Sequence, residues 1–166
     1  SVRPIREVAL WNRSPQRAQA LAAQLAPTGL AVTVATDLEA AARRADIIST
    51  ATISAEPLIR GAWLAPGTHV DCVGAYRPNM RESDDEVVRR SRIYVDTRPG
   101  AFNEAGDILI PLAAGVIGKE AVLGDLFELA RGTVAGRGSP GEITFFKSVG
   151  AAIEDLAAAI AVYRHP

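Results

Sequence analysis

The sequence predicts an α/β fold in which helices cover both faces of a doubly wound, mainly parallel sheet. Short runs rich in β-branched residues alternate with segments whose apolar residues recur every three or four positions. Several of these runs are continuously apolar, which is typical of strands buried on both faces of a parallel sheet. Proline, glycine and asparagine between the runs mark the turns.

The predicted elements follow one another along the whole chain. The expected strands are Ile5 to Trp11, Ala31 to Ala35, Asp46 to Ala51, Thr68 to Val73, Arg92 to Asp96 and Ile143 to Lys147. The expected helices are one that begins at Pro15 and ends before Pro27, then Leu38 to Arg44, Asp84 to Ser91, Pro99 to Ala105, Leu123 to Arg131 and Gly150 to Tyr163. We expect Ser14, Thr36 and Ser83 to cap helices, the last two in capping boxes with glutamates three positions on.

Composition and charge exclude several classes of function. The chain has 166 residues, 18 basic and 19 acidic, so no strong overall charge draws it to nucleic acid or anionic lipid. Its single cysteine, Cys72, excludes an internal disulfide, and the isolated His69 and His165 do not have metal-ligand spacing. We therefore expect a cytoplasmic protein without a metal site or a membrane span. The start without methionine, close to a strand, predicts a piece of a longer chain.

The residues that follow the strands are the candidates for ligand binding, because parallel sheets bind ligands at the carboxyl ends of their strands. Asn12, Arg13 and Ser14 follow Trp11. An acidic residue there would bind the ribose hydroxyls of NAD, whereas an arginine with small polar neighbours suits the extra phosphate of NADP. The alternative is that Asn12 and Ser14 only cap the helix and Arg13 is a solvated surface cation.

Three further loops carry weaker signals. Small residues from Ala51 to Ser54 would let a nicotinamide ribose approach the backbone, although small residues also simply pack. Gly74 to Asn79 combines a glycine turn with an aromatic residue and a cation that could face a substrate, or is an ordinary loop. Lys147 and Ser148 end the last strand, where ligands meet hydroxyl and backbone donors, or form a plain turn.

The motifs together resemble the ornithine cyclodeaminase and mu-crystallin family. They are ALWNRSPQRAQALA, ADIISTAT, THVDCVGAYRPNMRESDDEV, FNEAGDI and EITFFKSVGAAIEDLAAA. The similarity extends from about Pro4 to Tyr163, and GAYRPNMRE and FKSVGAAIEDLA are its most diagnostic parts. The resemblance implies an NAD(P)-dependent enzyme, about twice this length and usually a homodimer, that handles small amino acids or their imines.

The resemblance also implies which part of such an enzyme this sequence forms. Residues 1–150 correspond to part of the NAD(P)-binding Rossmann domain, and residues 151–166 to the C-terminal helix that in the family packs on the substrate and dimerisation domain. The family's first strand and glycine fingerprint precede Ser1, as do the arginine and lysine that hold the substrate carboxylate. The G-x-G-x-x-G pattern at residues 136–141, GRGSPG, lies in a predicted loop ahead of the strand Ile143 to Lys147. We therefore expect a Rossmann-like sheet without its first strand and glycine-rich turn.

That strand lies, in the usual order, between the strand Ile5 to Trp11 and the strand Asp46 to Ala51. We expect these two strands to pair directly, or the place between them to be filled by another segment or a neighbouring molecule.

The resemblance assigns cofactor contacts to positions that match the family pattern. They are Asn12, Arg13 and Ser14 at the adenosine ribose, Thr50, Ala51 and Thr52 along the cofactor, Gly74, Ala75 and Arg77 beside the nicotinamide, and Lys147 and Ser148 near its carboxamide. The expected cofactor is NADP(H), with NAD(H) as the alternative, because Arg13 stands where NAD-specific enzymes carry an acid.

Tyr76 is the candidate catalytic residue, and it separates two branches of the family. Cyclodeaminases similar to this chain carry an aspartate at this loop position, whereas the R-P-x-x-R-E arrangement from Arg77 to Glu82 resembles the ketimine reductase and mu-crystallin branch. The resemblance therefore implies an imine reductase that uses NADPH on a ketimine or on pyrroline-2-carboxylate. The alternatives are an ornithine cyclodeaminase, which forms proline and ammonia, and a non-catalytic protein that binds NADP or a small ligand.

Overall fold

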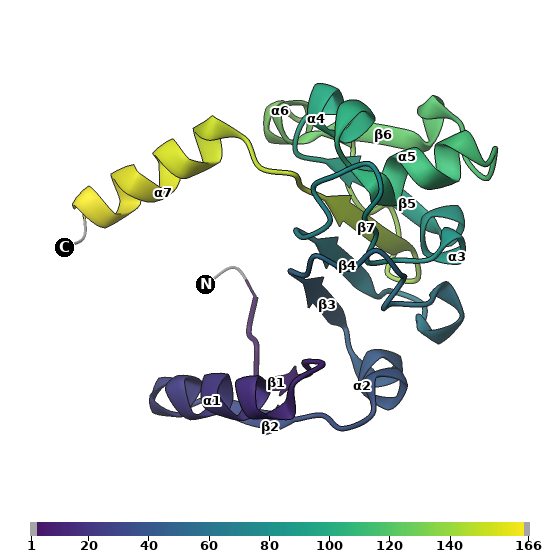
Figure 1. The fold of residues 1–166 in the computed structure, drawn as a ribbon. Helices are drawn as coiled ribbons and strands as arrows, with labels where there is room; N and C mark the ends of the chain where they lie inside the picture. Colours follow the sequence, from purple (N-terminus) through teal and green to yellow (C-terminus); the bar gives the residue numbers. More distant parts are fainter. Residues whose placement is uncertain (1–2, 165–166) are drawn as a thin grey trace. The chain divides into compact units, whose positions relative to one another are not determined.

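The structure is a computed structural model that describes residues 3–164, and it consists of two compact units divided between Arg44 and Ala45. His165, a residue considered as an isolated histidine, lies outside the described residues. Each unit is an α/β arrangement with parallel strands only (Figure 1). Among residues 3–164 the structure contains no helix whose length and apolar character would suit a bilayer crossing.

The first unit is a short β-α-β-α segment. Its elements are β1 (Glu7–Leu10), α1 (Pro15–Leu25), the 3-10 turn η1 (Ala26–Thr28), β2 (Ala31–Val34) and α2 (Leu38–Arg44). β1 and β2 pair in parallel over four residues each, and α1 contacts β2. Gly29 ends η1 with a φ of 77°, a conformation that glycine adopts without steric cost.

The second unit contains a five-stranded parallel sheet in the order β3-β4-β7-β5-β6. The strands are β3 (Ile47–Thr50), β4 (His69–Cys72), β5 (Ser91–Val95), β6 (Val122–Asp125) and β7 (Ile143–Lys147). The helices are η2 (Gly61–Trp63), α3 (Asp85–Arg90), α4 (Arg98–Asn103), α5 (Gly106–Ala113), η3 (Lys119–Ala121), α6 (Leu126–Arg131) and α7 (Ala152–Arg164). Val70, Ile93, Val95 and Phe145 are fully buried, so the core lies on the central strands β4, β7 and β5.

The predicted parallel α/β class is confirmed, but as two sheets rather than one. β1 pairs only with β2, and β3 pairs only with β4, among the described residues. Of the two alternatives expected for the strands at Ile5 to Trp11 and Asp46 to Ala51, direct pairing therefore does not occur among the described residues, and the filling of the place between them by another segment or molecule stays a prediction. β3 is an edge strand, and Ile47 on it is 43% exposed.

Two helix caps differ from the predicted ones by one residue. Asp37, not Thr36, accepts a hydrogen bond from the backbone N–H of Ala40 at the start of α2. Asp84, not Ser83, caps α3 by accepting from Val87 N. The Ser83 hydroxyl instead donates to the buried Asp107 carboxylate at 2.7 Å. A tertiary partner thus removes the predicted cap.

The segment from Gly106 to Arg131 departs most from the expected elements. Residues 123–125, predicted to begin a helix, belong to β6, and α6 begins at Leu126. Pairing with β5 outweighs the local helical pattern there. Asp125 and Glu128 form the capping box that starts the helix. The sequence did not predict α5, which contains Pro111, a residue that normally interrupts helices.

Candidate functional site

The turn after β1 presents the polar residues that the sequence singled out. Asn12 Oδ1 accepts a hydrogen bond from the backbone N–H of Ser14 at 2.8 Å and so closes the turn before α1. The Ser14 side chain does not cap α1 and donates to Gln16 instead. Arg13 is exposed, and its guanidinium has no hydrogen-bond or ion-pair partner among residues 3–164. Arg13 is thus available to an anionic ligand.

The carboxyl ends of β3, β4 and β7 lie next to one another at one end of the larger sheet. Strand register places Thr50 opposite Cys72, and Cys72 opposite Lys147. The three strands are parallel, so the loops that follow them leave the sheet at the same end (Figure 1). Seven of the predicted site residues lie at this carboxyl end: Thr50, Ala51, Thr52, Gly74, Ala75, Lys147 and Ser148. Asn12, Arg13 and Ser14 belong to the other compact unit.

Lys147, the last residue of β7, is hydrogen-bonded to the backbone at the end of β4 and in the loop that follows it. Its side chain is fully buried. The ammonium Nζ donates to the backbone oxygen of Cys72 at 3.1 Å and also to that of Gly74. It lies 3.8 Å from Asp107 Oδ2, which forms a buried ion pair. The predicted cofactor contact of Lys147 stays a prediction, and the contacts of Nζ are with the protein itself.

Two buried carboxylates complete this polar cluster. Asp107 Oδ1 accepts from the backbone N–H groups of Glu82 and Ser83 at 2.9 and 2.8 Å. Glu82 Oε1 accepts from the backbone N–H of Thr52 at 2.5 Å. Both carboxylates are fully buried, and one oxygen of each, Glu82 Oε2 and Asp107 Oδ2, accepts no hydrogen bond from the described residues. The cluster therefore joins α5, the segment that ends in Ser83, and the loop after β3.

Gly74 and Ala75 turn the chain sharply at the end of β4. A Cβ atom on Gly74 would lie 2.0 Å from the backbone oxygen of Thr52, so only glycine fits. Ala75 is fully buried and has a φ of 51°, a left-handed conformation that residues other than glycine rarely adopt. Its N–H donates to the backbone oxygen of Thr52 at 2.8 Å. The two loops after β3 and β4 are therefore in direct backbone contact.

Tyr76 and Arg77 lie on the outside of this turn. Both are exposed, Tyr76 to 44%, and the Arg77 guanidinium lies over the Tyr76 ring at 5.6 Å from its centroid. An exposed phenol beside a cation can donate a hydrogen bond or pack against a ligand ring. The catalytic role predicted for Tyr76 and the cofactor contact predicted for Arg77 stay predictions.

Ser148 is hydrogen-bonded to Asp96, a buried acidic residue at the end of β5. Its hydroxyl donates to Asp96 Oδ2 at 3.0 Å, and the same oxygen accepts from the backbone N–H groups of Val149 and Gly150. Asp96 follows β5 directly and is 1% exposed. Its carboxylate thus fixes the segment between β7 and α7.

Cys72 lies between Thr50 and Lys147 in the strand register and is fully buried. Burial raises the pKa of the Cys72 thiol well above its usual value, and the negative charge of Asp107 raises it further. A protonated thiol is a poor nucleophile. Among residues 3–164 no three histidine, cysteine or acidic side chains are grouped to hold a metal ion.

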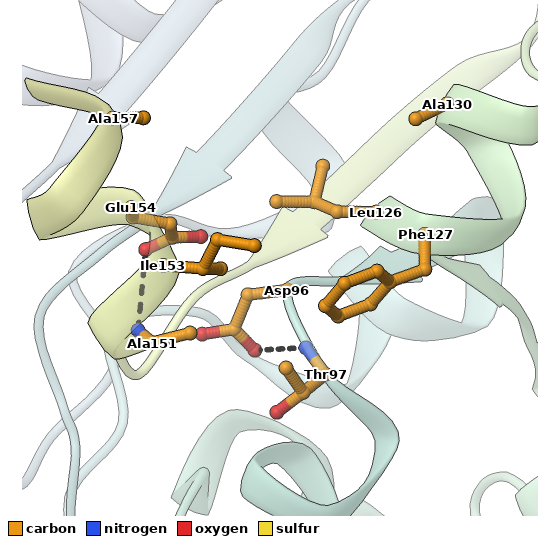
Figure 2. A pocket seen from close by; sticks show the side chains of 9 residues that line it. All are labelled: Asp96, Thr97, Leu126, Phe127, Ala130, Ala151, Ile153, Glu154 and Ala157. Carbon is orange, nitrogen blue, oxygen red and sulfur yellow. Dashed lines mark hydrogen bonds between the residues drawn. The ribbon is translucent and has the colours of Figure 1, made fainter. Parts of the chain in front are cut away.

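A separate pocket of about 280 Å³ lies between α6, the start of α7 and the end of β5 (Figure 2). Leu126, Phe127 and Ile153 contribute apolar walls, and each is more than a third exposed. Its charged lining residues are Asp96 and Glu154, both acidic. Such a lining is unsuited to the negatively charged pyrophosphate of a dinucleotide, so we do not assign the cofactor to this pocket.

Three acidic residues, Glu82, Asp96 and Asp107, were therefore missed as parts of the site. Glu82 and Asp107 occur in the motifs GAYRPNMRE and FNEAGDI, which carry the family resemblance. Asp96 stands at the end of a predicted strand, the one strand end between Val73 and Lys147 that was not considered. The position of Asp96 was a usable signal. Nothing local to Glu82 or Asp107 indicates burial, because charged residues are seldom fully buried.

Comparison with known proteins decides the family. The model of the ornithine cyclodeaminase/mu-crystallin family matches residues 1–165. The chain belongs to this family. Over 92% of its length it is 43% identical to a delta(1)-pyrroline-2-carboxylate reductase from Paracoccus denitrificans, and over 95% it is 37% identical to the ketimine reductase mu-crystallin of Mus musculus. The expected resemblance and its reductase relatives are thus confirmed.

A solved structure extends the likeness of this family member to three dimensions. The delta(1)-pyrroline-2-carboxylate reductase of Thermococcus litoralis, in complex with NADH and L-proline, superposes with a TM-score of 0.93 at 36% identity. The match covers 98% of this chain and 51% of that chain. The shares of the Paracoccus and Mus proteins that are covered are 48% and 47%. The chain thus spans about half the length of these relatives.

Proposed function

We propose that this chain is the dinucleotide-binding part of a reductase that converts a cyclic or linear imino acid into the amino acid. The observation that carries the proposal is the cluster of predicted cofactor residues at the carboxyl edge of a parallel sheet, in a chain that is 43% identical to a pyrroline-2-carboxylate reductase. The substrate class comes from that relative. The chain covers 48% of the relative, so the activity is proposed for the complete gene product that contains it.

The residues of the site fit a dinucleotide. Arg13 offers a planar set of donors without a partner among residues 3–164, next to the hydroxyl of Ser14. In the second unit, Ala51 after β3 is small and exposed, so a ligand can approach the backbone at the end of that strand. A bound nicotinamide supplies the hydride that reduces a C=N bond. The chain's own residues hold and orient the cofactor there.

We propose that Arg13 causes the complete protein to bind NADP more tightly than NAD. A guanidinium can donate two parallel hydrogen bonds to the extra phosphate of NADP, and no acidic residue stands in the turn to bind the ribose hydroxyls. The Thermococcus relative holds NADH, so NAD(H) stays the alternative cofactor.

The same proposal includes a further strand, a dimer and a cellular location for the complete protein. β3 has one edge that pairs with no strand among residues 3–164, and we propose that a further strand from outside residues 1–166 pairs there, beside the exposed Ile47. That strand would carry the glycine-rich turn of the Rossmann fold. We also propose a homodimer for the complete protein, with residues 151–166 packed on a substrate and dimerisation domain, and a cytoplasmic location.

Tyr76 favours reduction over cyclodeamination. Forming a ring from ornithine requires a group that moves protons near neutral pH, and a carboxylate can do this. A phenol, with a reference pKa of about 10, is a poor base at that pH. Tyr76 thus supports a hydrogen-bonding or packing role against an imino acid, and ornithine cyclodeamination remains the second enzymatic candidate.

Steady-state kinetics on the complete gene product test the proposal. We expect oxidation of NADPH that depends on pyrroline-2-carboxylate, and little ammonia release from ornithine. Robust release of ammonia that is unaffected by Tyr76→Phe would contradict both the reductase assignment and the role of Tyr76. Tight NADPH binding without turnover of any imino acid would indicate the non-catalytic alternative.

A further inference from the structure

The turn at Gly74 and Ala75 is held in a conformation that its own sequence disfavours. Ala75 is the residue other than glycine that adopts a positive φ within the described part of the chain. A left-handed alanine is unfavourable because its Cβ crowds the backbone. Residues in such conformations persist only when the surrounding structure fixes them, and they occur preferentially at functional sites. The contacts that fix Ala75 are therefore informative.

Thr52 is the residue through which Ala75 is fixed. The backbone oxygen of Thr52 accepts from Ala75 N, and the backbone N–H of Thr52 donates to Glu82 Oε1. Glu82 thereby fixes the peptide before Thr52, which is directly bonded to the residue whose oxygen receives the Ala75 hydrogen bond. The Lys147 ammonium also contacts this turn, because it donates to the backbone oxygen of Gly74.

Glu82 is itself firmly anchored. Its backbone N–H donates to Asp107 Oδ1, and its backbone oxygen accepts from Leu58 and Ile59 at 2.8 and 2.9 Å. The side chain is fully buried, so its carboxylate has lost its hydration. A buried charged group is often no more stabilising than an apolar residue of similar size. Overall stability alone is therefore a weak reason for a carboxylate at this position.

We propose that Glu82 is a positioning residue, which acts on the cofactor and substrate through the loops after β3 and β4. The carboxylate accepts from Thr52 N–H and so fixes the backbone that holds left-handed Ala75, next to Tyr76 and Arg77. Glu82 touches neither ligand. The inference rests on the proposed cofactor-binding function of the loops after β3 and β4. It adds to that function a residue that contacts only protein.

Three variants of the complete gene product test whether the length or the charge of the Glu82 side chain matters. Glu82→Gln keeps an oxygen that can accept from Thr52 N–H but removes the charge, whereas Glu82→Asp keeps the charge and is one methylene too short. Glu104→Gln, on an exposed glutamate at the end of α4, is the matched control. All assays are run well below each variant's unfolding temperature, so that lost stability does not appear as lost activity.

We expect Glu82→Asp to lower kcat/KM for imine reduction by about 10- to 100-fold, the effect of misplacing a catalytic geometry by about 1 Å. Glu82→Gln should stay within about fivefold of the unchanged protein, and the control should match it. Equal activity of Glu82→Asp and the control would overturn the proposal. So would an equal loss in the Gln and Asp variants, because Glu82→Gln keeps an oxygen that reaches Thr52 N–H and should therefore keep the loop in place.

Hydrogen exchange gives a readout that needs no turnover. We expect the amides of residues 52 and 75 to exchange at least about tenfold faster in Glu82→Asp and to stay protected in Glu82→Gln. Unchanged protection in Glu82→Asp overturns the positioning role even if the protein reduces no imine. Inactive unchanged protein with the expected exchange pattern would instead contradict the proposed function and leave the role of Glu82 in ordering the loops supported.

Discussion

Asp96 and Ser148 join the carboxyl ends of two neighbouring strands, because the Ser148 hydroxyl after β7 donates to the Asp96 carboxylate after β5 at 3.0 Å. Asp96 Oδ2 also accepts two backbone N–H groups of the following segment. A single buried carboxylate thus orders the chain between the sheet and α7.

Replacing Asp96 should therefore be more harmful than replacing Ser148. Asp96→Ala leaves several buried donors without an acceptor and should lower the free energy of unfolding by about 3 kcal/mol, whereas Ser148→Ala should lower it by about 1 kcal/mol. Urea unfolding measures both, with Asp46→Ala, an exposed aspartate on the same unit, as the control. A larger loss for Ser148→Ala would contradict the role of Asp96.

Gly74 should tolerate no side chain. A Cβ there would meet the backbone oxygen and nitrogen of Thr52 at 2.0 and 2.3 Å, and backbone atoms cannot move aside cheaply. We expect Gly74→Ala to lower the free energy of unfolding by about 3 kcal/mol. Gly136→Ala is the control, because nothing lies within 4 Å of its Cβ, and should change stability by less than about 0.5 kcal/mol. Similar effects of the two changes would show that the turn is loosely packed.

Cys72 should make stability depend on alkaline pH. Because burial raises the pKa of the Cys72 thiol, the folded protein keeps the proton that the unfolded chain loses above about pH 8.5. This contribution to stability is therefore complete below that pH and decreases as the pH rises above it. Between pH 7.5 and 9.5 the unchanged protein should lose about 1 kcal/mol more than Cys72→Ala in urea unfolding. Parallel pH dependences would contradict a buried, protonated thiol.

Arg13 should distinguish the two nucleotides. If its guanidinium binds the extra phosphate, Arg13→Ala weakens NADPH binding by about 10- to 100-fold and NADH binding by much less. Dissociation constants measured by fluorescence titration of the complete gene product test this. Arg44→Ala, an exposed arginine at the end of α2, is the control. Equal losses for both nucleotides would show that Arg13 does not bind the phosphate.

The sequence predicted most of the strands because each combines a short apolar run with a turn signal. The strands predicted at Ala31, Asp46, Thr68 and Ile143 all appear, within one or two residues at their ends. The helix caps were less predictable. Ser83 has the right type and spacing for a cap, but the buried Asp107, 24 residues away, takes its hydroxyl. Such competition between local and tertiary hydrogen bonds is not visible in a sequence.

The candidate site was predictable where it consists of strand ends and not where it depends on burial. Thr50 and Lys147 follow from the rule that parallel strands present their carboxyl ends together, and register aligns both with Cys72. Glu82 resembles any charged loop residue in the sequence. Its burial results from the way the 74–83 segment folds back over Thr52, which depends on contacts across 30 residues.

The transfer of a labelled hydride tests the central claim most directly. The complete gene product is incubated with pyrroline-2-carboxylate and NADPH in which both hydrogens at C4 of the nicotinamide are replaced by deuterium, and the proline formed is analysed by mass spectrometry and NMR. The account predicts one deuterium at C2 of proline for each NADPH oxidised, with the proton on nitrogen taken from water. Proline without deuterium, or no proline while NADPH still binds, would contradict the assignment of this chain to an imine reductase.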